Sequence, residues 1–252
     1  MLVRTEGIVL RSMPYKETTR LVTLYTRELG KLTVIAKGGQ SVKSRFGSTL
    51  QVMSHVQAVI FSRPTRSIQV LSDCSHITVY SKIADHLEKL AVGQRICELV
   101  LLITEEGQRS SEIFQLFVNV LAALNDSKAH PLTLKLYFQL RFTEFLGFAP
   151  AFTKESVEQI DTSGGYLLLD DGTMTVDVQD QQNAVYASRG VLRAFAILNR
   201  SEFNVILKLQ LTDKQYKELN ELTHKFMRYH MPDIFSFRGQ KIMDQLLETN
   251  KS

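Results

Sequence analysis

The densest group of residues able to bind an anion lies in one short stretch, residues 37–45. Its sequence is Lys-Gly-Gly-Gln-Ser-Val-Lys-Ser-Arg. The stretch offers two lysines, an arginine, two serine hydroxyls and glycine backbone amides, which are the groups that hold phosphate oxygens in nucleic-acid complexes. These residue types predict binding of a phosphate backbone.

Other cations gather in the same part of the chain. Residues 1–80 hold eleven basic and four acidic residues, a net charge of +7, whereas the remaining 172 residues have a net charge of −3. Such an asymmetry indicates a polyanionic partner for the first part, although a merely solvated basic face is the alternative. We expect these cations to contact nucleic acid: Arg4, Arg11, Arg20, Arg27, Lys37, Lys43, Arg45 and Arg66.

Three aromatic residues lie near these cations in the sequence. Tyr15, Tyr25 and Phe46 could stack on bases, as aromatic rings interleaved with cations do in single-strand-binding proteins. The alternative for Tyr25, which falls inside an expected strand, and for Phe46 is a place in the core. The sequence pattern favours the core for both.

Groupings typical of catalysis are absent. The chain has no GxxxxGK[ST], GxGxxG, HExxH or GxSxG motif. Asp170 and Asp171 fall in an expected hairpin turn, where Asp is common for backbone reasons. His224 and His230 are six residues apart, a spacing that puts them on different sides of a helix. We therefore expect no enzyme, no catalytic residue, and no metal or other cofactor.

Composition limits the class of protein. The chain has 252 residues and 44% hydrophobic content, enough for a sizeable core, and no apolar run near the roughly 20 residues that span a bilayer. Cys74 and Cys97 form no CxxC pair, so we expect buried free thiols in a reducing compartment. The expected location is cytoplasmic, without membrane contact.

The first 80 residues read as strands. Period-two patterns and turn residues predict strands over residues 3–11, 20–26, 31–37, 51–62 and 67–73, with a polar connection at 15–19. Gly30 is expected in the tight turn between the second and third strands. Five strands with a longer connection between the third and fourth predict an OB-fold β-barrel, although strand count alone leaves an SH3-like barrel open.

Helical spacing replaces this pattern after residue 80. Helices are expected from about Leu87 to Ile103 and over residues 112–124, 131–146, 188–199 and 212–230. Tyr166 to Val178 reads as a β-hairpin with Asp171-Gly172 as its turn. The predicted class is α+β. A barrel domain occupies residues 1–80, and a mainly helical domain occupies residues 81–252, with a hairpin insertion at about 151–180.

Several motifs together resemble the RecO family of recombination-repair proteins. They keep their order along the chain and are Thr5-Glu-Gly-Ile-Val-Leu10, Tyr15-Lys-Glu17, Arg20-Leu-Val22, Leu24-Tyr-Thr26, Gly30, Ala36-Lys-Gly38, Arg45-Phe46, Leu146-Gly-Phe-Ala-Pro150, Ser188-Arg-Gly-Val-Leu192 and Ser236-Phe-Arg238. Each motif alone is weak, but together they are fairly specific.

The resemblance implies a function in DNA repair and DNA recombination after DNA damage. It implies an N-terminal OB-fold with a helical C-terminal domain, binding of single- and double-stranded DNA, and strand annealing without ATP. It also implies cooperation with RecR, contact with the tail of single-strand-binding protein, and help in loading RecA, at the bacterial nucleoid.

One segment departs from the family pattern. Many family members carry four zinc-binding cysteines after the Leu-Gly-x-x-Pro motif, whereas residues 151–178 contain no cysteine. Asp161-Thr-Ser-Gly164 stands where a CxxCG element is expected. We therefore predict no zinc and a hairpin held by packing alone.

The implied contact with a protein tail needs a receptor site. Because that tail is acidic and ends in hydrophobic residues, the site requires an apolar groove with a basic rim. Arg189, Arg193, Arg200 and Lys208 are the candidates in the helical domain. An ordinary charged helix face is the alternative for each.

Two other functions compete with this reading. An RNA-binding OB-fold protein without a recombination role would use the same stacking and phosphate contacts. A phosphodiester-cleaving enzyme would need the clustered carboxylates of two-metal chemistry, which the sequence does not offer.

Overall fold

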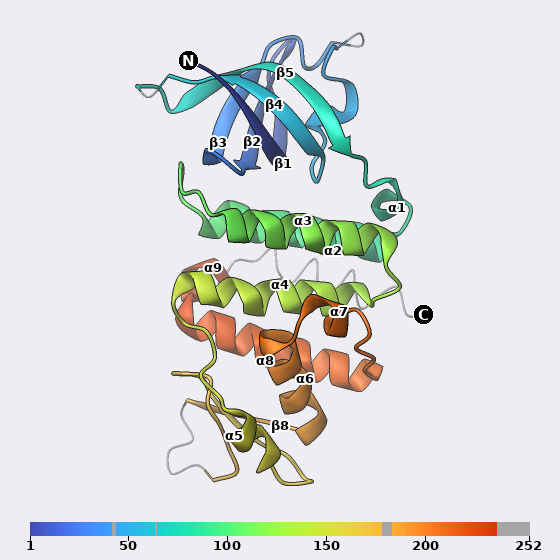
Figure 1. Cartoon of the computed structure of the whole chain (residues 1–252), viewed down its shortest axis with the longest axis vertical. Coiled ribbons are helices and arrows are strands. Elements are labelled where there is room, and N and C mark those ends of the chain that lie inside the picture. The colour runs from blue at the N-terminus through green and yellow to red at the C-terminus, as the bar shows by residue number, and fades with distance from the viewer. Residues whose placement is uncertain (42–43, 64, 178–182, 236–252) are drawn as a thin grey trace. The chain divides into compact units, whose positions relative to one another are not determined.

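The structure is a computed structural model that describes residues 1–41, 44–63, 65–177 and 183–235. It divides into two compact units, Met1–Asp126 and Ser127–Ser252. The first unit holds all strands of the barrel, drawn in blue to cyan in Figure 1, and the second holds the later helices and a small sheet.

Five strands close into a barrel in the first unit. They are β1 (Leu2–Lys16), β2 (Thr19–Thr26), β3 (Gly30–Ala36), β4 (His55–Phe61) and β5 (Ile68–Thr78). The strand order around the barrel is β1-β2-β3-β5-β4; β3 and β5 are parallel, and the other neighbours are antiparallel. This closed five-stranded barrel confirms the expected fold class.

Alternation along the strands fills the barrel. Val22 and Leu24 on β2 and Val34 on β3 are fully buried, whereas the residues between them are half-buried. Phe46, from the connection between β3 and β4, joins the same core. Because side chains on a strand alternate between its two faces, the intervening residues point outward.

Strand bounds differ from the sequence prediction at three places. β1 continues to Lys16 instead of Arg11, past register shifts that its alternation did not reveal. β4 begins at His55 instead of Gln51, because Met53 has a positive φ of 70° and Ser54 donates locally to Gln51. β5 continues beyond Asp73 to Thr78, where it pairs with the start of β4.

Helices pack against the barrel within the first unit. They are η1 (Gly47–Leu50), α1 (Ser81–Ala84), α2 (Leu87–Ile103) and α3 (Ser111–Asp126). Phe114 of α3 lies with its ring 6.4 Å from that of Tyr25 on β2, and the Lys31 ammonium donates to the Leu101 carbonyl of α2 at 2.9 Å. The compact unit therefore extends past the barrel, and the predicted domain division after residue 80 stays a prediction.

The second unit is built around α4 (Pro131–Leu146), which is buried on all sides over its middle turns. The elements that follow are α5 (Lys154–Glu158), β6 (Gly165–Leu168), β7 (Met174–Thr175), β8 (Ala184–Ala187), α6 (Arg189–Arg200), α7 (Phe203–Ile206), α8 (Asp213–His230) and α9 (Pro232–Phe235). Thr133 of α4 hydrogen-bonds Tyr216 of α8 at 2.8 Å. A helix that is apolar all round is one that its neighbours cover, as here.

The small sheet has the strand order β7-β6-β8. The predicted hairpin is present as β6 and β7, but the third strand, β8, was missed because its four residues carry too short a pattern to register. Gly147 ends α4 with a φ of 81°, as predicted, and Thr212 caps α8 in a capping box. Of the helices described, none is both long enough and apolar enough to cross a membrane.

Candidate nucleic-acid interface

An OB-fold barrel binds oligonucleotides on the outer face of strands 2 and 3 and through the loops that join strands 1–2 and 4–5. In this chain the outer face carries an unusual row of side chains. Pairs of direct cross-strand neighbours link Leu21 to Ile35, Ile35 to Val70, and Val70 to Phe61. At the two ends, Met13 pairs with Leu21 and Leu2 pairs with Phe61.

Direct cross-strand neighbours share one face of a sheet. Leu21, Ile35 and Phe61 each lie next to a fully buried residue along their strand, so their side chains point away from the core. Leu2 is 61% exposed and Phe61 is 39% exposed. Six apolar residues thus follow one another outside the core on all five strands. We call this row the apolar belt; it consists of Leu2, Met13, Leu21, Ile35, Phe61 and Val70.

A polar row borders the belt. Arg11 pairs with Thr23, and the Thr23 and Thr33 hydroxyl oxygens are 3.3 Å apart, so the row crosses β1, β2 and β3. Thr33 in turn pairs with exposed Ile68 on β5. The outer face therefore combines hydroxyl groups and a cation with the apolar surface.

Cations stand at both loops that flank the belt. The Arg63 guanidinium lies 5.2 Å from the centre of the Phe61 ring, directly after β4. The Lys16 ammonium lies 5.8 Å from the ring centre of Tyr15, which is 53% exposed beside the connection from β1 to β2. Each exposed aromatic ring on this side of the barrel thus has a cation next to it.

The predicted DNA-binding residues lie in different surroundings. Arg4, Arg11, Lys37, Arg45 and Arg66 are exposed. Arg20 is half-buried and donates to the hydroxyl of Ser12 at 2.9 Å. Lys43 lies outside the described residues. These positions distribute the predicted cations over the barrel surface, and their contact with DNA stays a prediction.

Arg27 differs from the other predicted cations. Its Nε donates to Glu6 at 2.8 Å, its terminal nitrogen donates to Gln115 at 3.3 Å, and its guanidinium lies 4.7 Å from the ring centre of Phe114. The guanidinium therefore has partners on β1 and α3 within the first unit.

Two of the three aromatic candidates belong to the core. Tyr25 and Phe46 are buried, so base stacking on either ring is wrong, and the core alternative is confirmed. Burial raises the pKa of the Tyr25 hydroxyl to about 12. Tyr15 remains available, and Phe61 is the aromatic residue that sequence reasoning missed. Its signal was the exposed end of an alternating strand followed closely by Arg63.

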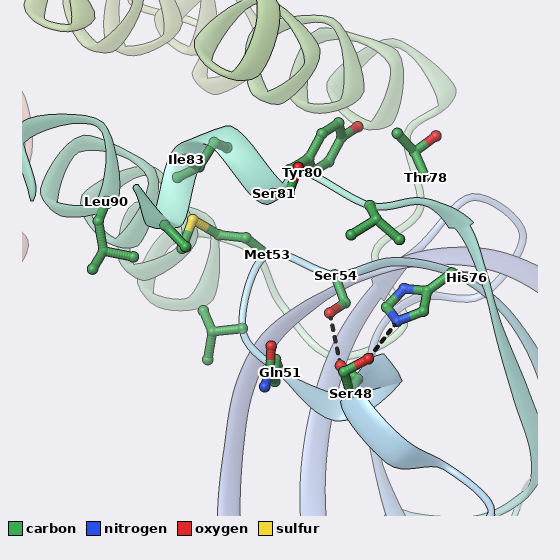
Figure 2. Close-up of a pocket in the computed structure, with 13 residues that line it drawn as sticks. Ser48, Gln51, Met53, Ser54, His76, Thr78, Tyr80, Ser81, Ile83 and Leu90 are labelled. Carbon is green, nitrogen blue, oxygen red and sulfur yellow. Dashed lines mark hydrogen bonds between the residues drawn. The ribbon is translucent and has the colours of Figure 1, made fainter. Parts of the chain in front are cut away.

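A cavity of about 210 Å³ lies in the first unit between the start of α2, α1 and the end of β5 (Figure 2). The Ser48 hydroxyl is 3.0 Å from Nε2 of His76, a distance that a nucleophile and its base would also have. Such a base needs a third group to orient it. Within the described part of the chain, Nδ1 of His76 is buried without a hydrogen-bond partner, so the pair lacks this third group.

The predicted tail-binding arginines lie on α6. Arg193 and Arg200 are exposed, and Arg189 is half-buried. Spacings of four and seven residues put all three on one stripe of the helix. The Arg200 guanidinium lies 4.8 Å from the ring centre of Phe152. The stripe is a basic surface in the second unit, and its role stays a prediction, as does that of exposed Lys208.

The residues present do not fit a zinc site of the kind expected from the resemblance. Asp161 accepts hydrogen bonds from the hydroxyls of Thr162 and Ser163, at 3.1 and 3.2 Å. Among the residues that the structure describes, no three His, Cys, Asp or Glu side chains gather as metal ligands would. The small sheet instead packs on its neighbours, with Gly172 close against Pro150.

Comparisons with known proteins cover both parts of the chain. The family model described as Recombination protein O N terminal matches residues 1–80, and the model described as Recombination protein O C terminal matches residues 84–235. The DNA repair protein RecO of Salinibacter ruber is 36% identical over 245 residues, which are 97% of this chain and 94% of the relative. The DNA repair protein RecO of Chloroherpeton thalassium is 25% identical over 258 residues, which are 98% of this chain and 100% of the relative.

Proposed function

The chain belongs to the RecO family of DNA repair proteins, and on that premise we propose that it is a non-catalytic mediator that binds DNA and anneals complementary single strands. The observation that carries the proposal is the apolar belt with cations at its borders. Such a surface offers contacts to phosphates and to unpaired bases together.

Phosphate contacts explain how this surface favours annealing. Two complementary strands repel each other through their phosphates, and bound cations reduce this repulsion. The cations that we assign to this role are Arg4, Arg11, Arg20, Lys37, Arg45, Arg63 and Arg66. Arg27 is left out because its guanidinium already binds Glu6.

The proposal includes partners and a location. We propose that the protein acts with RecR to load RecA onto DNA coated by single-strand-binding protein, in the cytoplasm at the bacterial nucleoid. The basic stripe of α6, formed by Arg189, Arg193 and Arg200, is the proposed site for the acidic tail of single-strand-binding protein. Replacing Arg193 by Glu should weaken binding of a synthetic tail peptide, and unchanged binding would remove Arg193 from this role.

The decisive experiment is the annealing of two complementary strands coated with their cognate single-strand-binding protein, without any nucleotide. We expect faster duplex formation with this protein than without it. Lack of acceleration at every salt concentration would contradict the mediator function. Parallel reactions with RNA strands test the alternative, since an RNA-binding protein without a recombination role would bind RNA more tightly and would leave DNA annealing unchanged.

Salt dependence provides a second measurement. If about six cations contact phosphates, the affinity for DNA should fall about a thousandfold between about 50 and 200 mM salt. Labelled DNA incubated with magnesium should stay intact, because the described residues offer no cluster of metal-binding carboxylates. Cleavage products would point to a nuclease instead.

A further inference from the structure

We propose that the apolar belt is a base-reading track that selects unpaired DNA over duplex DNA, with Phe61 as its stacking residue. This inference rests on the proposed function and adds to it the part of the DNA that the belt contacts. The cations at the belt's borders serve both DNA forms, because both carry phosphates. Only an unpaired strand can also place its bases on an apolar surface.

The register of the barrel determines the length of this track. Five steps between neighbouring strands join Leu2 to Met13 along the belt. With strands about 4.8 Å apart, the belt is about 24 Å long. This length corresponds to about seven nucleotides at a rise of about 3.4 Å each, within the range of about 4 to 16 that one OB barrel covers.

The charges around the belt indicate which partner covers it. Arg63 lies over the Phe61 ring, and Arg66 follows in the same connection between β4 and β5. Lys37 follows β3 directly and is exposed, two residues after Ile35 of the belt. A strand whose bases lie on the belt would have phosphates within reach of these cations. An apolar protein partner would gain nothing from them, so the charges favour a nucleic-acid strand.

The test compares Phe61→Ala with the unchanged protein on three probes of the same length. The probes are an oligothymidylate of about 15 nucleotides, an abasic strand with the same phosphates, and a duplex. Binding is measured by fluorescence anisotropy. We expect the variant to lose about 5- to 150-fold in affinity for the oligothymidylate. Its affinity for the abasic strand and for the duplex should change by less than about twofold.

Two further variants serve as matched controls for Phe61→Ala. Leu102→Ala removes an apolar side chain that is 44% exposed on α2, away from the belt, and should leave all three affinities unchanged. Ile35→Thr keeps a β-branched residue at the middle of the belt and should reduce only oligothymidylate binding, which covers the case in which Phe61→Ala unfolds the barrel.

The outcomes separate this inference from the proposed function. Equal losses on the oligothymidylate, the abasic strand and the duplex would overturn base reading, because the belt would then act through phosphates or through the fold. Unchanged binding of every probe by both belt variants would assign the belt to a protein partner instead. In both cases the annealing activity could persist, whereas failure of the unchanged protein to bind any DNA would overturn the proposed function itself.

Discussion

Glu6 of β1 accepts a hydrogen bond from Nε of Arg27 at 2.8 Å, through its carboxylate oxygen Oε2. Its other oxygen, Oε1, is 2.7 Å from Nε2 of buried His55 on β4. Burial alone would raise the pKa of Glu6, but the hydrogen bonds and charges of Arg27 and His55 outweigh it and hold that pKa below 4.5. The ionised carboxylate therefore stabilises the folded barrel.

Glu6→Gln should lower the free energy of unfolding by about 1 to 3 kcal/mol at pH 7, the range for a lost hydrogen bond to a charged group. Because the folded-state pKa of Glu6 is depressed, its contribution is fully present above the ordinary value of 4.5. The contribution disappears as the pH falls through the folded-state pKa. Urea unfolding at several pH values measures the difference between the two proteins.

The control for this prediction is Glu17→Gln, which changes an exposed carboxylate in the connection from β1 to β2. It should alter unfolding by less than about 0.5 kcal/mol at every pH. A difference between Glu6→Gln and the unchanged protein that stays constant down to acid pH would show that packing, not charge, is responsible.

Arg66→Ala should weaken DNA binding and reduce the slope of log affinity against log salt by about 1, because one phosphate contact is lost. Titrations of labelled DNA at several salt concentrations provide this slope. Lys217→Ala removes an exposed charge from α8 and should leave the slope unchanged. If both variants have the slope of the unchanged protein, Arg66 does not touch phosphate.

Much of the fold could be predicted because local patterns decide it. α4 begins at Pro131 and ends at Leu146 as the sequence indicates, since Pro suits a first helical position and Gly147 accepts the left-handed conformation at its end. Strand ends were harder to predict. The end of β5 depends on pairing with β4, and pairing between distant segments leaves no local signal.

The candidate site was only partly predictable for the same reason. The excess of cations was visible in the composition, but the belt exists only in the cross-strand register. Ile35 alternates with buried residues among threonine and lysine, so by itself it indicates no surface for a ligand. Its neighbours Leu21 and Val70 are 14 and 35 residues away, and only barrel closure brings them beside it.

A chelator should leave the thermal stability unchanged. Residues 151–178 contain no cysteine, and the sheet of the second unit is held by contacts such as Gly172 against Pro150. Melting curves with and without EDTA should therefore coincide, and elemental analysis of the purified protein should find less than about 0.1 zinc per chain. A lower melting temperature in EDTA together with bound zinc would overturn this prediction.

Gly30→Ala should strongly destabilise the first unit, because two separate costs fall on one residue. Gly30 has a φ of 66°, which costs an L-residue about 1 to 2 kcal/mol. An added Cβ would also lie 2.3 Å from the carbonyl oxygen of Gln108, backbone that cannot rotate away. Gly38→Ala isolates the first cost, since Gly38 has a φ of 75° and open space around its Cβ position. Urea unfolding should therefore find the loss at Gly30 larger than the loss at Gly38 by at least about 1 kcal/mol. Equal losses would mean that the approach of residues 107–109 to the β2–β3 turn contributes nothing to the stability of the unit.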